Sequence, residues 1–296
     1  LALGPLEKAF PDLIPLQVDS PPNSEPMFAR RTFAWGLVVL FSVVTAWGAE
    51  SPREVHIGQT LLNRLDLANA DLAGVKACVD RNDPAAALAA LVEHFRRRWP
   101  EPPRPDGLSA AALKECLQAL ENRFRSVGSD RFFTLGEDFA WNRNAISDKE
   151  WLLHFQWHQW LKTLVEAGHI ESDPRYTRKA IELIRDWIPQ NYPGASWSWR
   201  TLEVALRAVN WAKVYRYLLH APDFTPADHA AFLNTLAEHF DYLLPVERFH
   251  SRHNFGATES RALLIGGLQF PEFAHAKQWR TTAWHRFEGE ITDQVL

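Results

Sequence analysis

The fold is decided by the stretch Thr201-Leu202-Glu203-Val204-Ala205-Leu206-Arg207-Ala208-Val209-Asn210-Trp211. In a helix, Glu203, Arg207 and Asn210 lie on one face, because they are spaced i, i+4 and i+7. The other faces are almost wholly apolar, and a helix that is apolar on most sides is usually buried. The polar stripe then faces either partners inside the protein, such as an ion pair between Glu203 and Arg207, or a wet cavity that binds a ligand. These two interpretations are compatible.

Helical signals continue on both sides of this stretch. A capping residue followed by proline occurs at Asp83-Pro84, Asp173-Pro174 and Thr225-Pro226. Apolar residues recur at helical spacing over residues 57–79, 85–99, 108–124, 148–168, 174–190, 199–220, 226–244, 257–269 and 272–295. One short segment, 132–135, is instead expected to be extended. A series of helices joined by short loops predicts an all-α fold of antiparallel helix pairs, which can stack in a ring or a solenoid.

The composition excludes several classes of protein. The 296 residues are 46% hydrophobic and 23% charged, which is typical of a globular protein and not of a disordered or collagen-like chain. The net charge of −4 lacks the basic excess of nucleic-acid-binding domains, so we expect no nucleic-acid partner. Cys78 and Cys116 cannot form a four-cysteine zinc site, although an oxidising compartment would allow one disulfide. The 13 tryptophans require either a large core or a surface on which sugar rings stack.

The first 48 residues are predicted to lie outside the folded domain. Met27, the sole methionine, begins a positively charged segment, which is followed by an apolar run and then by small residues at the positions that signal peptidase recognises. This is the pattern of a secretory signal peptide. The apolar run is short for a membrane span of about 20 residues, and an uncleaved anchor is the alternative. Residues 1–26 are then upstream sequence, 27–48 the signal peptide and 49–296 a periplasmic or secreted domain without membrane contact after cleavage.

A second polar stretch, residues 249–261, lies between two predicted helices. It reads Phe249-His250-Ser251-Arg252-His253-Asn254-Phe255-Gly256-Ala257-Thr258-Glu259-Ser260-Arg261. Its basic and amide side chains suit a carboxylate or a sulfate, because helix N-termini attract anions. The alternative is that Asn254 only caps the helix through its side chain. His250 and His253 have no acidic or histidine neighbour at ligand spacing, so no metal site is predicted.

A third stretch, residues 151–160, is unusually aromatic. His154 and His158 are spaced i, i+4, as in zinc-binding helices, but the glutamate that this motif places between them is missing. Trp157 and Trp160 are neighbours on one helical face. The stretch therefore predicts an aromatic core with partly exposed histidines.

The two polar stretches resemble the N-terminal domain of the heparinase II/III family of polysaccharide lyases. The likeness rests on residues 201–211, His253-Asn254-Phe255-Gly256 with the downstream Glu259, Arg261-Ala262-Leu263-Leu264 and Phe270-Pro271-Glu272. It covers roughly residues 80–296. The resemblance implies an incomplete (α/α) toroid of antiparallel helix pairs, which a β-sandwich domain follows in full-length relatives. Residues 49–296 would then be a partial toroid domain.

The resemblance also implies an activity, cleavage of a uronate-containing polysaccharide such as heparan sulfate or alginate by β-elimination. The C5 proton of a uronate is very weakly acidic while the neighbouring carboxylate keeps its charge, so an enzyme must neutralise that carboxylate or hydrogen-bond to it. In the family an asparagine of the matching loop takes this role, which carries over to Asn254 as the catalytic residue. The family's catalytic tyrosine and histidine match no residue here, so we expect this chain alone to be inactive. No cofactor is implied.

The candidate substrate-binding residues come from both polar stretches. They are Trp199, Glu203, Arg207, Asn210, Trp211, Arg252 and His253. Among the aromatic residues, we expect at least one of Trp197, Trp199 and Trp211 to line a groove beside Arg207 and Asn210.

Two other classes of function fit the same residues. One is a glycoside hydrolase on a helical toroid, which would use two carboxylates such as Glu203 and Glu259. The other is a non-catalytic glycan-binding module or a helical scaffold. The partner of a lyase or a binding module would be an acidic polysaccharide or oligosaccharide.

The signal-peptide hypothesis predicts where the mature protein begins. Expression from Met27 in a Gram-negative host should yield a periplasmic product whose N-terminus, read by mass spectrometry, lies near Ala49. Recovery of the intact chain from the cytoplasm would contradict this prediction.

Overall fold

Three helices begin at the caps that the sequence predicts. Each starts with proline directly after a capping side chain: α3 (Pro84–Arg98), α7 (Pro174–Gln190) and α9 (Pro226–Leu243). At α9 the cap is a complete capping box, in which the side chains of Thr225 and Asp228 each bind the other's backbone N–H. The caps satisfy N–H groups that would otherwise lack a partner, so local chemistry sets these three boundaries.

The computed structural model describes most of one unit, Gly48–Leu296. The described residues are 58–125, 128, 130–136, 139–141, 148–193 and 197–294. The predicted signal peptide, 27–48, and the residues before it lie outside them. Among the described residues, no helix combines the length and the apolar character needed to cross a membrane.

Most of the described chain is helical. Residues 58–62 are helical, and the further helices are η1 (Ala70–Leu72), α2 (Ala73–Asp80), α4 (Ala110–Leu120), α5 (Lys149–Phe155), α6 (Gln159–Glu171), η2 (Trp197–Trp199), α8 (Thr201–Leu218), η3 (Val246–Arg248), α10 (Asn254–Gln269) and α11 (Ala276–Gln294). Cys78 and Cys116 are both buried and are not joined in a disulfide.

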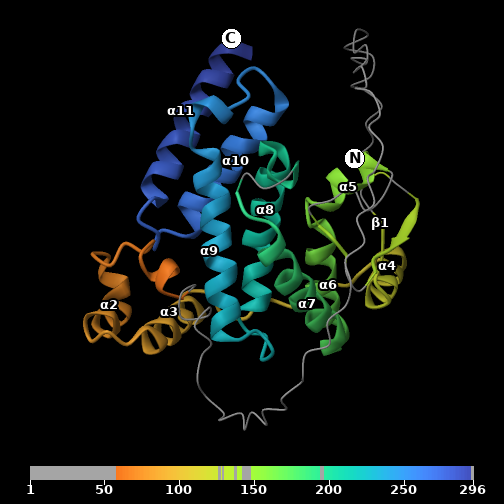
Figure 1. Cartoon of the computed structure of the whole chain (residues 1–296), viewed down its shortest axis with the longest axis horizontal. Coiled ribbons are helices and arrows are strands. Elements are labelled where there is room, and N and C mark those ends of the chain that lie inside the picture. Colours follow the sequence, from red (N-terminus) through yellow and green to blue (C-terminus); the bar gives the residue numbers. More distant parts are fainter. Residues whose placement is uncertain are drawn as a thin grey trace, which may run out of the picture. The chain divides into compact units, whose positions relative to one another are not determined.

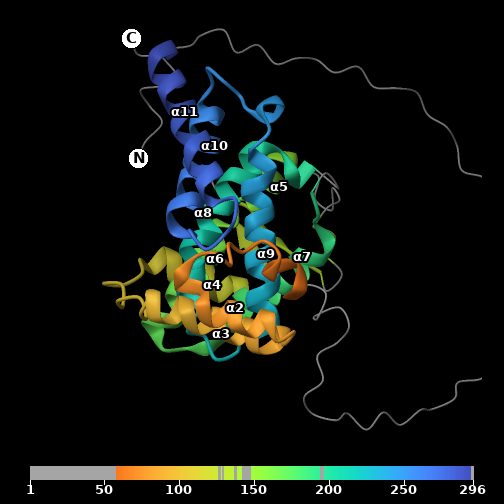
Figure 2. The ribbon, with the colours of Figure 1, turned by 90° about the vertical axis from the view of Figure 1, so that its left-hand side faces the viewer.

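Several pairs of successive helices pack against each other, and they are α2–α3, α6–α7, α8–α9, α9–α10 and α10–α11. α8 contacts both α9 and α10, and α10 packs along α11, so that these four helices lie side by side (Figure 1). α6 packs against α8 and α7, on the side of α8 away from α11. α2 and α3 lie across the lower ends of the long helices (Figure 2). This arrangement confirms the all-α prediction.

One small antiparallel hairpin interrupts the helices. β2 (Phe132–Thr134) confirms the expected extended segment, and it pairs with β1 (Arg123–Arg125) so that Phe133 lies opposite Phe124. The expected helix over 108–124 therefore ends early, at Leu120. Phe124 is 2% exposed and packs on Phe155, which favours the strand over a last helical turn.

The expected single helix over 148–168 is in fact two helices, α5 and α6. The break lies at His158, whose φ of 55° is left-handed. Gln156, just before the break, binds the Trp187 Nε1–H through Oε1 at 2.9 Å and is 1% exposed. His158 accepts a hydrogen bond from Trp211 Nε1 at 3.0 Å. Long-range hydrogen bonds of these polar side chains thus override the apolar period. The expected aromatic core is confirmed, but of its two histidines only His154 is partly exposed, and the expected exposure of His158 is wrong because this ring is buried.

The close contact between α9 and α10 depends on a glycine. A Cβ atom at Gly266 would lie 2.8 Å from two carbons of the Phe240 ring, and Phe240 is 1% exposed. In contrast, a Cβ atom at Gly289 in α11 would meet nothing within 4 Å.

We expect Gly266→Ala to destabilise the protein by about 1–3 kcal/mol, because the buried Phe240 ring must move. Gly289→Ala is the matched control and should stabilise it by about 0.5–1 kcal/mol through helix propensity. Urea unfolding followed by circular dichroism measures both. Equal effects of the two substitutions would show that the α9–α10 contact is looser than described.

Candidate functional site

Arg207 is the central polar residue of the helix that decides the fold, and it is fully buried. Its Nε donates to His239 Nε2 at 2.7 Å, and its Nη1 donates to the carbonyl oxygens of Gln156 and Ser198, both at 3.1 Å. The guanidinium carbon lies 4.5 Å from the centre of the Trp187 ring. One cation thereby ties α8 to α9, to the α5–α6 connection and to η2.

The electrostatics of this cluster keep the surrounding histidines neutral. Burial lowers the pKa of His239 well below its usual value, and the charge of Arg207 lowers it further. The pKa of His158 falls for the same two reasons. Burial also lowers the pKa of Arg207 to about 9, against the opposing effect of Glu203, so the guanidinium remains charged at neutral pH. A neutral His239 can accept the Arg207 hydrogen bond, which an imidazolium could not do.

Glu203 pairs with a different arginine from the one that the sequence suggested. Its Oε2 lies 3.5 Å from Arg200 Nε, whereas Arg207 binds His239 and two carbonyl groups. Burial raises the pKa of Glu203, and the charge of Arg200 and then that of Arg207 oppose the rise. The internal Glu203–Arg207 ion pair is therefore replaced by an Arg200–Glu203 pair at the start of α8.

The expected aromatic groove is not formed by Trp199 or Trp211. Trp199 is 1% exposed and stacks on His239 with ring centres 4.9 Å apart, and Trp211 is 0% exposed and stacks on Phe232 at 4.4 Å. The side chain of Trp197 lies outside the described residues. Both described rings belong to the core.

The same burial corrects the assignment of the polar stripe on α8 to substrate contact. Glu203 and Arg207 are enclosed, and the Asn210 amide donates to the carbonyl oxygen of Trp157 at 2.7 Å. These residues, with Trp199 and Trp211, are therefore structural in the conformation described. Most of α8 is buried, with exposed positions at Lys213 and Arg216.

The second polar stretch is open to solvent at the start of α10. His253 is the N-cap of this helix, and its Nδ1 accepts the backbone N–H of Phe255 at 3.2 Å. Asn254 is the first helical residue and is exposed, and among the described residues its side-chain amide has no hydrogen-bond partner. The alternative that Asn254 is the cap is therefore wrong, and its amide remains available.

The turn before this cap is held by α11. Arg252 has a left-handed φ of 58°, and its backbone N–H donates to Glu290 Oε1 at 2.8 Å. Its Nε lies 3.1 Å from Asp293 Oδ2, and its side chain is largely exposed. Gly256 allows the first turn of α10 to lie against the His250 carbonyl oxygen, which a methyl group would strike. Arg252, His253 and Asn254 are thus brought together on one exposed turn.

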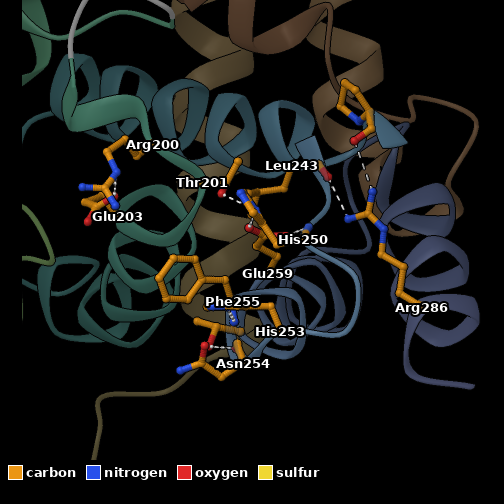
Figure 3. A network of polar contacts seen from close by, with 12 residues as sticks. Arg200, Thr201, Glu203, Leu243, His250, His253, Asn254, Phe255, Glu259 and Arg286 are labelled. Atoms are coloured by element: carbon orange, nitrogen blue, oxygen red, sulfur yellow. Dashed lines mark hydrogen bonds and ion pairs between the residues drawn. The ribbon is translucent and has the colours of Figure 1, made fainter. Parts of the chain in front are cut away.

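A histidine–glutamate pair lies beside this turn. His250 Nδ1 is 2.7 Å from Glu259 Oε1, and the His250 backbone N–H donates to Glu259 Oε2 at 3.1 Å. Thr201, the first residue of α8, places its Oγ1 3.2 Å from the same Nδ1, so Figure 3 shows His250 between Thr201 and Glu259. Sequence reasoning missed this pair, because a contact across a nine-residue turn follows no helical or strand period.

The burial of the two glutamates also bears on the hydrolase alternative. Glycoside hydrolysis needs two carboxylates that flank an open space for the sugar. Glu203 is 1% exposed and Glu259 is 0% exposed, and each already contacts a basic side chain. This pair therefore does not supply the required geometry. Within the described ranges, no three His, Cys, Asp or Glu side chains form a metal-binding group.

The fold defines a class of protein built from packed helix pairs, and the candidate site is the exposed polar turn where α10 begins. The chain belongs to the family described as heparinase II/III N-terminus, whose model matches residues 61–296. The toroid that the resemblance implies is confirmed, because the chain superimposes on solved structures that contain an (α/α) toroid.

Two curated relatives and two solved structures show the extent of the likeness. The heparin-sulfate lyase of Pedobacter heparinus is 25% identical over 277 residues, 87% of this chain and 41% of its own length. The heparin-sulfate lyase of Bacteroides thetaiotaomicron is 28% identical over 267 residues, which cover 83% of this chain and 37% of the relative's own length. The heparan sulfate lyase HepC from Pedobacter heparinus superimposes with a TM-score of 0.73 at 23% identity, covering 80% of this chain and 40% of that one. A heparinase III structure superimposes with a TM-score of 0.75 at 21% identity, covering 84% of this chain and 42% of that one.

The chain therefore spans about two fifths of the length of the curated relatives that it matches. The solved structures are less than 25% identical to it and establish the fold.

The geometry at the start of α10 predicts which residue stabilises the helix. His253→Ala should lower the free energy of unfolding by about 1 kcal/mol, because the Phe255 N–H loses its acceptor. His253→Ser supplies a hydroxyl acceptor and should restore most of that loss. Asn254→Ala should stay within about 0.5 kcal/mol of the parent, since the amide has no structural partner. Thermal melting of the three variants is the measurement, and a large loss with Asn254→Ala alone would contradict the assignment of the cap.

Proposed function

We propose that the full-length protein that carries this chain cleaves a uronate-containing polysaccharide of the heparan sulfate class by β-elimination, with Asn254 as the group that neutralises the uronate carboxylate. The observation that carries the proposal is the free, exposed amide of Asn254 on a helix that His253 already caps. The heparin-sulfate lyases among the relatives support the class of substrate.

The proposed chemistry follows from the acidity of the substrate. Removal of the C5 proton places negative charge on the adjacent carboxylate, so a hydrogen bond to that group is strongest in the transition state. An amide N–H can donate this bond without titrating. Asn254 is therefore suited to stabilise the developing charge, while the base and the acid come from other residues of the full-length protein.

The surroundings of Asn254 favour an anionic ligand. Arg252 and His253 lie on the same exposed turn, where the Arg252 side chain also contacts Asp293. The first turn of α10 adds the positive end of its helix dipole. Among the substrate-binding residues expected from the sequence, Arg252 and His253 remain candidates for direct contact with the polysaccharide.

We also place the mature protein in the periplasm or outside the cell. The support is the signal-peptide pattern of residues 27–48, together with a substrate that is an extracellular polymer. Cleavage of the signal would leave the domain without a membrane anchor.

The proposal predicts a kinetic effect at one residue. In the full-length protein, Asn254→Ala should lower kcat on heparan sulfate by about 10²–10³ and change KM far less, because one transition-state donor is lost. Asn254→Asp should be at least as damaging, since it sets a like charge against the carboxylate. The ultraviolet absorbance of the C4–C5 double bond in the product measures turnover.

The exposed Asn63 provides a control, and Asn63→Ala should leave turnover unchanged. Alginate, tested in parallel, shows which uronate is preferred. Products without ultraviolet absorbance would indicate a hydrolase, and binding without any product would indicate a glycan-binding module. Near-normal turnover by Asn254→Ala would overturn the role of the amide.

A further inference from the structure

The His250–Glu259 pair has no part in the chemistry proposed for Asn254, yet the fold fixes it firmly. Glu259 is 0% exposed, and both of its carboxylate oxygens contact His250, one at the ring and one at the backbone. A buried carboxylate is costly unless it is paired and hydrogen-bonded. Glu259 therefore needs a cationic or N–H partner for each of its oxygens, and the ring and the backbone N–H of His250 supply them.

Among the described residues, the polar contacts of the imidazole ring are both at Nδ1. Nδ1 lies 2.7 Å from Glu259 Oε1 and 3.2 Å from Thr201 Oγ1, and the ring meets the edge of Phe255 at 5.8 Å between centres. The His250 side chain is nevertheless 50% exposed. Among the described residues no hydrogen-bond partner occupies Nε2. Glu259 thus assigns the Nδ1 proton and leaves Nε2 for a ligand.

The charged groups around the ring are mostly engaged with one another. On α8, Arg200 pairs with Glu203, and on α11, Glu290 accepts the Arg252 N–H. Arg286 of α11 lies to the right of Glu259 in Figure 3 and donates to the carbonyl oxygens of Leu243 and Leu244. Burial lowers the pKa of Arg286, and the charge of Glu259 opposes this effect. Among the described residues, Glu259 is consequently the carboxylate in direct contact with the His250 ring.

We propose that His250 Nε2 binds an oxyanion of the polysaccharide, a carboxylate or a sulfate, beside the sugar residue that binds at Asn254, and that Glu259 is the positioning residue that orients the ring. This inference rests on the proposed function for the identity of the polymer. The bound form is an imidazolium that donates Nε2–H to the oxyanion, so no proton is transferred in the step.

The test compares two histidines that each contact a buried or half-buried carboxylate. His250→Gln removes the charge at the proposed site, and Glu259→Gln removes the group that positions the ring. His275→Gln is the matched control, because His275 contacts Asp241 at 2.9 Å near the start of α11, outside the site. All three are made in the full-length protein, and kcat and KM for heparan sulfate are measured at pH 6 and pH 8.

We expect His250→Gln to raise KM about tenfold at pH 6, which corresponds to about 1.4 kcal/mol of lost binding, with kcat within about threefold of the parent. Glu259→Gln should shift KM in the same direction, and His275→Gln should shift neither parameter. Unsulfated heparosan, used beside heparan sulfate, distinguishes a carboxylate, which both polymers carry, from a sulfate.

Two results would overturn the inference. One is an unchanged KM for His250→Gln at both pH values; the other is a loss of kcat at unchanged KM, which would make His250 an acid or base instead. Should Glu259→Gln fail to fold, as judged by its circular dichroism melting curve, His250→Gln still decides the matter.

A binding measurement separates this inference from the proposed function. Calorimetric titration of a heparan sulfate hexasaccharide into Asn254→Ala, with and without His250→Gln, should show weaker binding in the double variant. If the parent forms no unsaturated product, the lyase proposal fails, and this titration still tests His250. Equal Kd values for the two proteins would overturn the role of His250 even in an active lyase.

Discussion

The buried guanidinium of Arg207 is the interaction on which the rest of the structure depends. It binds carbonyl groups of two irregular segments and the His239 ring of α9, so it joins parts of the chain that apolar packing alone would leave unspecified. A buried charge is costly unless it is hydrogen-bonded, and Nε and Nη1 of Arg207 obtain their partners only if the α5–α6 connection and η2 bring the carbonyl groups of Gln156 and Ser198 to it. The aromatic rings that enclose Arg207 exclude water and strengthen these bonds.

This internal frame sets the position of the exposed turn. Because α8 is fixed by Arg207, its first residue, Thr201, reaches His250, and α10 packs on α8 close enough for Glu259 to lie beneath the same ring. Asn254 and His253 then stand at the open end of α10. The polar stripe of α8 and the polar turn of α10 therefore have separate tasks, since the first holds the helices together and the second faces solvent.

Much of the fold could be predicted from the sequence because its causes are local. Proline after a capping side chain sets the starts of α3, α7 and α9, and the apolar period places most of the long helices. The break at His158 could not be predicted, because it depends on Trp187 and Trp211, which lie far along the chain. Of the candidate site, the loop around Asn254 was predicted, whereas the burial of Trp199 and Trp211 was not.

The sequence by itself determined the helical class, the family, and the polar turn that contains Asn254, since these depend on residue types at short spacing. Only the tertiary structure decided that Arg207 is internal, that His253 and not Asn254 caps α10, and that Glu259 holds His250. The physical reason is that solvent exposure and long-range partners depend on how helices pack. The sequence gives the same residue type for a glutamate that faces a sugar and for one that contacts an imidazole in the interior.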